Sequence, residues 1–525
     1  MWDKIIAAVT KVNSAINDVV WGWPMIILIL GTGILLTVLT KCMQVGKFGT
    51  SLQETIMPTI KGIGKKKKDI SKKENSISQF EAFATAISGT VGTGNIVGVT
   101  SAIMTGGPGA VFWMWISAFF GMVTNYAENV LGLYFRKKET NGDFSGGPAY
   151  YLSEGLGRNS NQSWLKVIGK ILGVMAAVFC TFAAIGMSGV QTNKISSTFQ
   201  GAIGGNNQVV AIVVGIVVAV VLALIVLGGI KSIGKVASIL VPFMSLLFMG
   251  MALIIVLVNA NMIGTAFGLI FKNMFTFKSA FAGVGGYAFA QIIQKGLARG
   301  VFSNEAGLGS SVIAHSASDT REPVRQGFWG IFGVFFDTFI ICTLTALVVL
   351  VSFGDEKGMA EVLYAQGAVD TVVSMSAFES VFGGFGTVVY STILPLFAFT
   401  TILAWSYYGE KSIDFLFRKA GDKARKIACT VFKVAYIALV IVASVIDGEL
   451  AWAISDTFNG LMALPNLIGL VLMSTLVAKI TKNYFDRKKG KDVEPMLSAY
   501  PEQNEEFKAD IKAEEAWAHA NAEND

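Results

Sequence analysis

The feature that most constrains this chain is a glycine-rich interruption inside an apolar segment long enough to cross a membrane. The segment extends from about Phe80 to Met104, and the stretch Gly89–Asn95 (GTVGTGN) lies in its middle. Each glycine weakens a helix by roughly 1 kcal/mol relative to alanine, so three glycines so close together predict an unwound backbone. Hydrocarbon tolerates unwound backbone only where it faces protein or a water-filled cavity. The stretch therefore predicts a polar cavity near the middle of the membrane, which in transporters holds a substrate and its coupling ion.

Composition places the whole chain in a membrane. Only 15% of the 525 residues are charged and 53% are hydrophobic, whereas soluble domains carry about 25% charge. Repeated apolar runs of 18 or more residues are typical of transmembrane helices, and we count eleven of them. The sequence therefore predicts an all-α polytopic membrane protein. The predicted spans are 23–43, 80–104, 108–134, 166–193, 207–228, 234–258, 279–299, 326–352, 384–408, 428–446 and 450–480.

Lysine and arginine residues predict how these spans are oriented. Basic loops follow the first, third, fifth, seventh and ninth spans, and the loops between them are poor in both residues. Because basic loops remain in the cytoplasm, the N-terminus is predicted outside and the C-terminus inside, in the plasma (inner) membrane. The densest basic tract, Lys61–Lys73, has no interleaved aromatic residue. This indicates a solvated loop and no nucleic-acid partner.

The two ends of the chain fall outside the predicted bundle. Residues 1–22 are amphipathic and predict a short helix lying at the membrane surface, and 23–43 is the span that follows it. Residues 481–525 are charged and predict a cytoplasmic tail that is partly disordered and dispensable for transport chemistry.

The sequence offers little for metal or enzyme chemistry. It has two histidines, and its four cysteines are far apart without a CxxC pair. These residues predict neither a disulfide nor a transition-metal centre. The sequence spells out no set of nucleophile, base and acid, which argues against an enzyme.

A second glycine-rich stretch lies five spans after the first. Gly283–Gly286 (GVGG) falls within the span 279–299. Because five is odd, the second block of spans enters the membrane in the opposite orientation. Paired interruptions at matching positions indicate an inverted-repeat transporter, here with residues 80–258 and 279–480 as its repeats. Gly283 and Gly285 thereby become candidates for substrate contact.

Close helix packing is the alternative explanation for such glycines. Gly92 and Gly94 are two positions apart and so lie on different helix faces, whereas a packing stripe needs a spacing of four. Thr90, Thr93 and Asn95 add polar groups that lipid would penalise. These residues favour a cavity lining.

A broken helix can bind both an anion and a cation. Its freed N–H groups suit a carboxylate, and around Gly92–Asn95 they are the natural partners for one. Its freed carbonyls suit a hard cation such as Na⁺, for which Ser88 and Val91 are candidates, with the Asn95 side chain as a further one.

The ninth span adds two hydroxyl groups. Thr400 and Thr401 follow Pro395, which leaves a carbonyl unpaired nearby. Both hydroxyls can reach one ion only at an irregular turn. The alternative is that each hydroxyl bonds back to its own helix.

Other polar and aromatic side chains complete the candidate set. Gln191 could bind a zwitterion or lie at the membrane interface, and Trp405 and Phe182 are candidate pocket walls or packing residues. Charges inside membrane helices are costly and indicate function. Asp337 is a candidate for cation coupling or for a substrate amine, or else a hydrogen-bonded clamp between helices. Glu128 is expected to bond unwound backbone.

Two long motifs carry a family resemblance. Gly89–Ile96 with Gly106–Trp115 (GGPGAVFWMW) closely resembles the alanine or glycine:cation symporter family, the sodium:alanine symporters. Gly296–Gly300 with Phe302–Gly307 (FSNEAG) is similar to its second signature. The resemblance covers about residues 20 to 480. It implies a LeuT-type fold, a five-plus-five inverted repeat, here with one additional N-terminal helix.

The resemblance also implies an activity and a set of site residues. The activity is Na⁺-driven uptake of a small neutral amino acid such as alanine or glycine. The substrate site would comprise Thr93, Gly94, Asn95, Gln191, Thr401 and Trp405. The Na⁺ ligands would be the carbonyls of Ser88 and Val91 and the hydroxyls of Thr400 and Thr401.

Several alternatives remain open from the sequence. Some family members resemble glutamine carriers, and H⁺ is possible in place of Na⁺. Thr90–Gly94 (TVGTG) differs at one position from a potassium-channel filter, but a filter needs four copies around an axis. An amino-acid sensor is a further alternative. We expect a monomer or a weak oligomer in the lipid bilayer.

Overall fold

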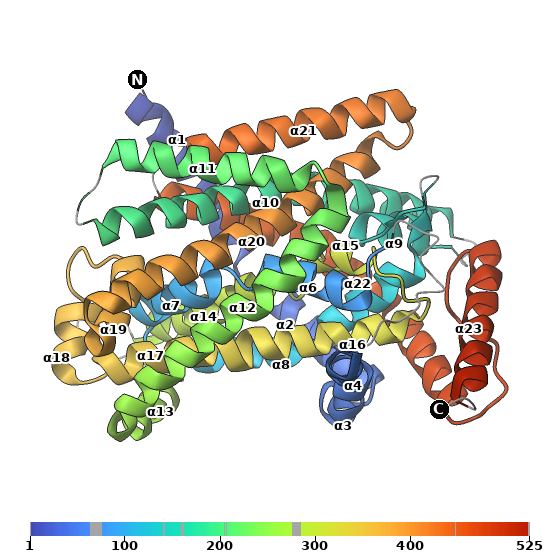
Figure 1. The fold of residues 1–525 in the computed structure, drawn as a ribbon, viewed down its shortest axis with the longest axis horizontal. Coiled ribbons are helices and arrows are strands. Elements are labelled where there is room, and N and C mark those ends of the chain that lie inside the picture. Colours follow the sequence, from blue (N-terminus) through green and yellow to red (C-terminus); the bar gives the residue numbers. More distant parts are fainter. Residues whose placement is uncertain are drawn as a thin grey trace.

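A computed structural model describes residues 2–62, 76–139, 142–158, 162–203, 205, 207–275, 285–446 and 448–522. Figure 1 shows long helices running side by side along the longest axis, with α12 crossing them and α23 standing apart at one end. The longer helices are α1 (Trp2–Val20), α2 (Trp23–Leu39), α6 (Gln79–Thr90), α7 (Val99–Gly106), α8 (Ala110–Tyr134), α9 (Pro148–Gly155), α10 (Ser163–Ala202), α11 (Gln208–Val226), α12 (Gly229–Val258), α13 (Ile263–Asn273), α14 (Gly285–Asn304), α16 (Pro323–Val334), α17 (Thr343–Phe353), α19 (Asp370–Phe382), α20 (Gly384–Phe417), α21 (Asp422–Ala443), α22 (Gly448–Lys488) and α23 (Pro501–Ala522).

Short elements connect these helices. They are α3 (Met43–Gly46), α4 (Phe48–Glu54), α5 (Ile56–Gly62), α15 (Ser311–His315), α18 (Glu356–Gly358), the π-helical turns η1 (Gly94–Gly98), η3 (Phe335–Cys342) and η4 (Met359–Leu363), the 3₁₀ turn η2 (Ala260–Met262), and an antiparallel strand pair of β1 (Lys137–Lys138) and β2 (Phe144–Ser145).

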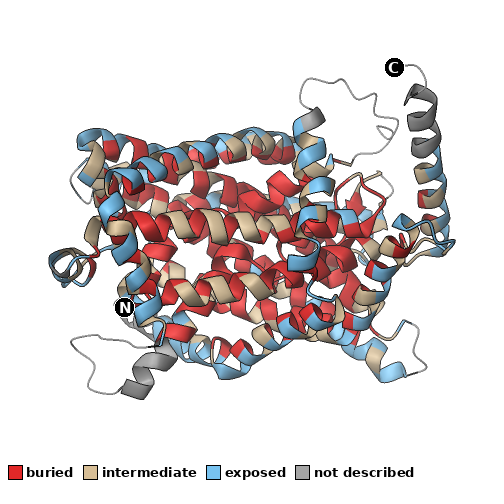
Figure 2. Ribbon diagram, turned by 90° about the horizontal axis from the view of Figure 1, so that it is seen from below, coloured by how far each residue is buried: buried red, intermediate tan, exposed pale blue. Residues whose placement is uncertain are grey.

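The helices fit a protein that crosses a membrane several times. Among the described residues, eight helices are long and apolar enough to span one, or ten if each of two bent pairs forms one span. In α8 and α20, 67% of the apolar window is buried, against 33% in α11 and 22% in α21. Figure 2 shows the buried residues gathered in the interior of the bundle. The outer helices α11 and α21 therefore present apolar side chains to the surroundings, as lipid contact requires.

The predicted break in the first apolar segment is confirmed. Helix α6 begins at a capping box, in which Ser78 and Glu81 satisfy each other's backbone N–H groups. It ends at Thr90, and the chain resumes as the π-helical turn η1 and then α7, with a bend of 48° between the two halves. The glycines of Gly89–Asn95 thus lie where the helix axis changes direction.

The predicted second interruption, Gly283–Gly286, lies partly outside the described residues, and a break is described at the other end of α14. Gly283 lies outside the described residues, and from Gly285 the helix α14 is continuous to Asn304. The chain then leaves the helix over residues 305–310, before α15. Three of these residues have positive φ, namely Glu305 at 54°, Gly307 at 92° and Gly309 at 76°. Since a left-handed conformation at a non-glycine residue is uncommon, Glu305 marks a definite break at this end of α14.

The N-terminal helix α1 packs on the bundle. Asn17 Nδ2 donates to Thr457 Oγ1 at 3.2 Å, and Trp21 Nε1 donates to the Asp456 carbonyl at 2.9 Å. Both acceptors belong to α22. Asn17 and Trp21 of the predicted amphipathic segment 1–22 therefore contact α22, while Lys11, Ser14 and Asp18 are exposed.

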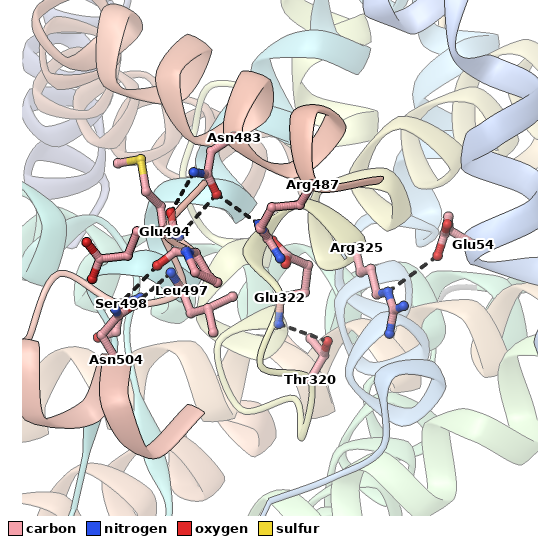
Figure 3. A network of polar contacts seen from close by, with 12 residues as sticks. Glu54, Thr320, Glu322, Arg325, Asn483, Arg487, Glu494, Leu497, Ser498 and Asn504 are labelled. Atoms are coloured by element: carbon pink, nitrogen blue, oxygen red, sulfur yellow. Dashed lines mark hydrogen bonds and ion pairs between the residues drawn. The ribbon is translucent and has the colours of Figure 1, made fainter. Parts of the chain in front are cut away.

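The predicted disorder of the tail is wrong for the described part, because residues 489–513 fold back onto one end of the bundle. Figure 3 shows Asn483 and Arg487 of α22 beside this returning segment and Glu322. Arg487 lies 2.6 Å from Glu322, and Asn483 Nδ2 donates to the Glu494 carbonyl at 2.8 Å. The Asn504 side chain closes the turn by accepting from the N–H groups of Leu497 and Ser498, at 2.9 and 3.1 Å. The polar composition of the tail suggested disorder, but these long-range contacts offset the conformational entropy that the tail loses when it becomes ordered.

Helix α23 contacts the loops near β1 and β2. Phe507 is fully buried and packs with Phe144, and the Arg136 guanidinium lies 3.9 Å from the Phe144 ring centre.

A second contact of the tail depends on pH. Tyr500 donates to Glu154 at 2.6 Å. Burial raises the pKa of the Glu154 carboxyl, but hydrogen bonds from Lys137 and Tyr500 outweigh it and hold this pKa below its usual range. The contact between Tyr500 and Glu154 is therefore retained at neutral pH and weakens only as the pH falls through this lowered pKa.

Replacing Phe507 with alanine tests whether the tail is docked. Loss of a buried phenylalanine costs about 3–5 kcal/mol in a core, so the tail should detach. We expect faster cleavage of Phe507→Ala by a soluble protease at residues 489–513, measured by mass spectrometry. Glu502→Ala, at an exposed position of the same helix, is the matched control. Equal cleavage rates in the two variants would contradict the docked tail.

Candidate functional site

The first break forms a small network of backbone and amide groups. The Gly92 N–H donates to Asn95 Oδ1 at 3.0 Å, and the Asn95 N–H donates to the Gly92 carbonyl at 3.3 Å. The Thr93 N–H donates to Gln191 Oε1 of α10 at 3.2 Å. Asn95 and Gln191 thus take over bonds that a continuous helix would make. The Thr93 hydroxyl is buried without a hydrogen-bond partner among the described residues.

Helix α20 meets this break through one threonine. Thr401 Oγ1 lies 2.9 Å from the Ser88 carbonyl and 3.1 Å from the Phe397 carbonyl. A Cβ placed on Gly92 would come within 2.5 Å of the same hydroxyl oxygen. The structure therefore brings Ser88 and Thr401 together beside the unwound backbone, and Val91 follows as the C-cap residue of α6.

Thr400 points elsewhere. Its hydroxyl lies 3.0 Å from the Phe397 carbonyl and 3.6 Å from Met244 Sδ of α12. Helix α20 is continuous through Pro395, so no irregular turn brings the two adjacent hydroxyls to one point. Thr400 would join Ser88 and Thr401 only after its hydroxyl turned away from Phe397.

A buried carboxylate lies on the other side of the break. Asp337 Oδ1 accepts from Asn95 Nδ2 at 2.6 Å, and its Oδ2 accepts from the hydroxyls of Ser303 and Thr338, each at 2.8 Å. The π-helical turn η3 presents Asp337, and π-helical turns are frequent at functional sites. Asp337 therefore links the first break to α14, the helix that precedes the second break.

The second break is held by two further buried carboxylates. Glu128 Oε1 accepts from the Gly307 N–H at 3.0 Å and from Asn466 Nδ2 at 2.6 Å, which confirms the expected bond to unwound backbone. Glu305 Oε1 accepts from Trp405 Nε1 of α20 at 3.0 Å. Trp405 is fully buried.

Two stacked rings separate the first break from a large cavity. A Cβ on Gly94 would lie 3.2 Å from the Phe302 ring, and Phe302 stacks on Trp452 with ring centres 5.0 Å apart. Trp452 lines a cavity of about 1330 Å³. The ion pairs Arg299–Asp456 at 3.3 Å and Lys194–Asp370 at 2.8 Å lie at this cavity. The rings thus close one route to the break.

The structure gathers most of the predicted site residues. Thr93, Gly94, Asn95 and Gln191 meet at the first break, Ser88 and Thr401 lie beside it, and Asp337 contacts Asn95.

Two predicted residues are separated from this group. Gly285 begins α14, which at about 1.5 Å per residue places it roughly 27 Å from Ser303 at the other end. Phe182 is 46% exposed and stacks on Phe458 at 5.1 Å, so it is no pocket wall.

Three residues of the site were not predicted from the sequence, namely Phe302, Ser303 and Glu305. All belong to the FSNEAG motif, which carried the family resemblance but received no role. A polar Ser303–Glu305 stretch at the end of an apolar span was the available signal for a second break.

The fold and the site define a class of protein. Two interrupted helices meet around buried amides, hydroxyls and a carboxylate inside a bundle of membrane helices, which is the arrangement of secondary transporters. Comparison with known proteins identifies the family. The model of the sodium:alanine symporter family matches residues 6–498, and the chain belongs to this family of multi-pass membrane transporters.

Individual proteins agree with this assignment. The chain is 40% identical to the sodium/alanine symporter AgcS of Methanococcus maripaludis, over 92% of this chain and 98% of that protein. It is 34% identical to the probable sodium/glutamine symporter GlnT of Bacillus subtilis, over 91% of each chain. The crystal structure of MhsT in complex with L-phenylalanine superposes with a TM-score of 0.53, covering 78% of this chain and 99% of that one at 15% identity. This likeness shows the LeuT-type fold.

An added methyl group at Gly92 tests the geometry of the break. Because a Cβ there would approach Thr401 Oγ1 to 2.5 Å, Gly92→Ala must displace the Thr401 hydroxyl from its place beside the Ser88 carbonyl, or shift α20 or the break itself. We expect it to lower uptake at least tenfold while the protein still inserts into membranes. Gly189→Ala in α10 is the matched control, since nothing lies within 4 Å of a Cβ there. Unchanged uptake in Gly92→Ala would contradict the contact.

Proposed function

We propose that this protein moves a small neutral amino acid, alanine or glycine, into the cell together with Na⁺ by alternating access. One observation carries the proposal: Thr401 of α20 meets the Ser88 carbonyl beside a break whose N–H groups are held by the Asn95 and Gln191 side chains. The relative AgcS, named a sodium/alanine symporter, supports both the ion and the substrate class.

The substrate carboxylate would bind the unwound backbone of the first break. Its oxygens would replace Gln191 Oε1 as the acceptor of the Thr93 N–H and accept from the backbone of Gly94 and Asn95, while Gln191 and the unpartnered Thr93 hydroxyl would add polar contacts. Trp405 would form a wall. The contact of Phe302 with Gly94 favours a short side chain.

Na⁺ would bind next to the substrate. The carbonyls of Ser88 and Val91 and the hydroxyl of Thr401 supply the hard oxygen ligands that it needs, with Thr400 joining after rotation. Asp337 and Asn95 offer a second position for a cation, or for H⁺ in its place, since a buried carboxylate there gains from a positive partner.

The membrane arrangement belongs to the same proposal. Eleven spans, with α14 as the seventh, would place the N-terminus outside and the C-terminus in the cytoplasm. Residues 80–258 and 279–480 would then be inverted repeats, each with its first helix broken. The basic loops of the sequence support this orientation.

Uptake in proteoliposomes tests the coupling. One Na⁺ moving down a potential of 100 mV releases about 2.3 kcal/mol, enough to concentrate a neutral substrate more than tenfold. We expect labelled alanine to accumulate with an inward Na⁺ gradient and only to equilibrate without one. Accumulation driven by a pH gradient alone would assign the coupling to H⁺, and equilibration under every gradient would refute symport.

The substrate needs a separate measurement, because GlnT makes a glutamine carrier the second candidate. Unlabelled alanine, glycine, serine and glutamine should be compared as competitors in the same assay. Competition by alanine and glycine at lower concentrations than glutamine supports the proposal. The opposite order favours the glutamine carrier.

The role of Thr401 predicts a change in Na⁺ dependence. Thr401→Val keeps the shape of the side chain but removes its oxygen, which should raise the half-saturating Na⁺ concentration at least tenfold. Thr401→Ser keeps the hydroxyl and is expected to stay within about threefold of the wild type. The Na⁺ dependence of initial uptake rates measures both variants. Equal values in the two would argue against a Na⁺ ligand at this position.

A further inference from the structure

One turn of α20 touches both broken helices. Thr401 lies beside the Ser88 carbonyl of the first break, and Trp405, four residues later on the same face, donates to Glu305 at the second. Both residues are fully buried. A shift of either break would therefore change a hydrogen bond to the same turn of α20.

Glu305 has an unusual position for this contact. It is fully buried and has a φ of 54°, at the point where α14 ends. Both carboxylate oxygens are engaged, one by Trp405 Nε1 at 3.0 Å and the other by the hydroxyl of Ser310 on the far side of the break. The carboxylate thus joins the two ends of the break to one indole ring.

The Trp405 indole is connected to the first break through Tyr408. Trp405 packs edge-to-face on Tyr408, with ring centres 5.5 Å apart. The Tyr408 hydroxyl lies 3.5 Å from the Ala86 carbonyl in α6. A Cβ on Gly89 would come within 2.8 Å of that hydroxyl, so the glycine leaves space for the tyrosine. Contacts therefore run without interruption from Glu305 to the end of α6.

We infer that Glu305 is a positioning residue for the transported amino acid, acting through Trp405. The inference rests on the proposed function, in which Trp405 is a wall of the substrate site. By fixing the indole through its N–H, the carboxylate sets the distance between the Trp405 ring and the unwound backbone of α6. Glu305 does not itself contact the substrate.

A double-mutant cycle tests this role in proteoliposome uptake. Glu305→Ala and Trp405→Phe each remove the same hydrogen bond, and each should raise the KM for the amino acid about tenfold. The double variant should be little worse than either single one, because both act through one contact. Glu305→Gln keeps an oxygen that can accept from the indole, and its KM is expected within threefold of the wild type.

Glu128→Ala is the matched control. Glu128 is also a buried carboxylate bonded to the second break, but its partners are Gly307 and Asn466. Its effect on KM should multiply with that of Trp405→Phe. If Glu305→Ala is not recovered as folded protein, Trp405→Phe and Glu305→Gln together decide the test.

The outcomes distinguish a failure of the proposed transport function from a failure of the positioning role of Glu305. Wild-type protein without amino-acid uptake would overturn the proposed function, and this inference with it. Wild-type uptake with an unchanged KM in Glu305→Ala or Trp405→Phe, or with multiplying effects in their double variant, would overturn the inference alone. A Glu305→Gln variant as impaired as Glu305→Ala would also overturn it, since the acceptor oxygen would then be irrelevant.

Discussion

The architecture depends on one constraint: backbone freed from a helix inside a membrane must find partners within the protein. At the first break, the side chain of Asn95 accepts the Gly92 N–H that a regular helix would use internally. At the second, the Glu128 carboxylate accepts the Gly307 N–H. An unsatisfied backbone group in hydrocarbon costs several kcal/mol, so these two side chains make the interruptions possible.

The same side chains tie the breaks to the rest of the bundle. Asn95 also donates to Asp337 in η3, and Glu128 of α8 also accepts from Asn466 of α22. Each break is thereby fixed to helices far away in sequence. Asn95 and Glu128 each bond the backbone of a break with one oxygen atom and still form a hydrogen bond to another element. Each side chain therefore couples the position of its break to that element.

Most of the helical framework could be predicted from apolar length and glycine position. The bend at Gly89–Asn95 follows from local backbone preference, and among the described residues eight helices, or ten with the two bent pairs, are long and apolar enough to cross a membrane. The second break could not be found in this way, because it contains a glutamate, Glu305, in a left-handed conformation, and the partners of its carboxylate, Trp405 and Ser310, are supplied by the folded chain. The docked tail was missed for a similar reason, since Phe507 is buried by segments distant in the chain.

The closure between the first break and the large cavity is built from few contacts. They are the Arg299–Asp456 ion pair and the stacked rings of Phe302 and Trp452, a kind of ring pair that contributes about 0.5–1.5 kcal/mol. In the proposed mechanism, alternating access requires this closure to open and reform. The difference between the loaded and the empty protein would then arise at the buried centre, where a ligand would compete for the hydrogen bonds of Asn95, Gln191 and Thr401. Helix α20, which contacts both breaks there, is the element best placed to convert occupancy of the site into movement of the ends.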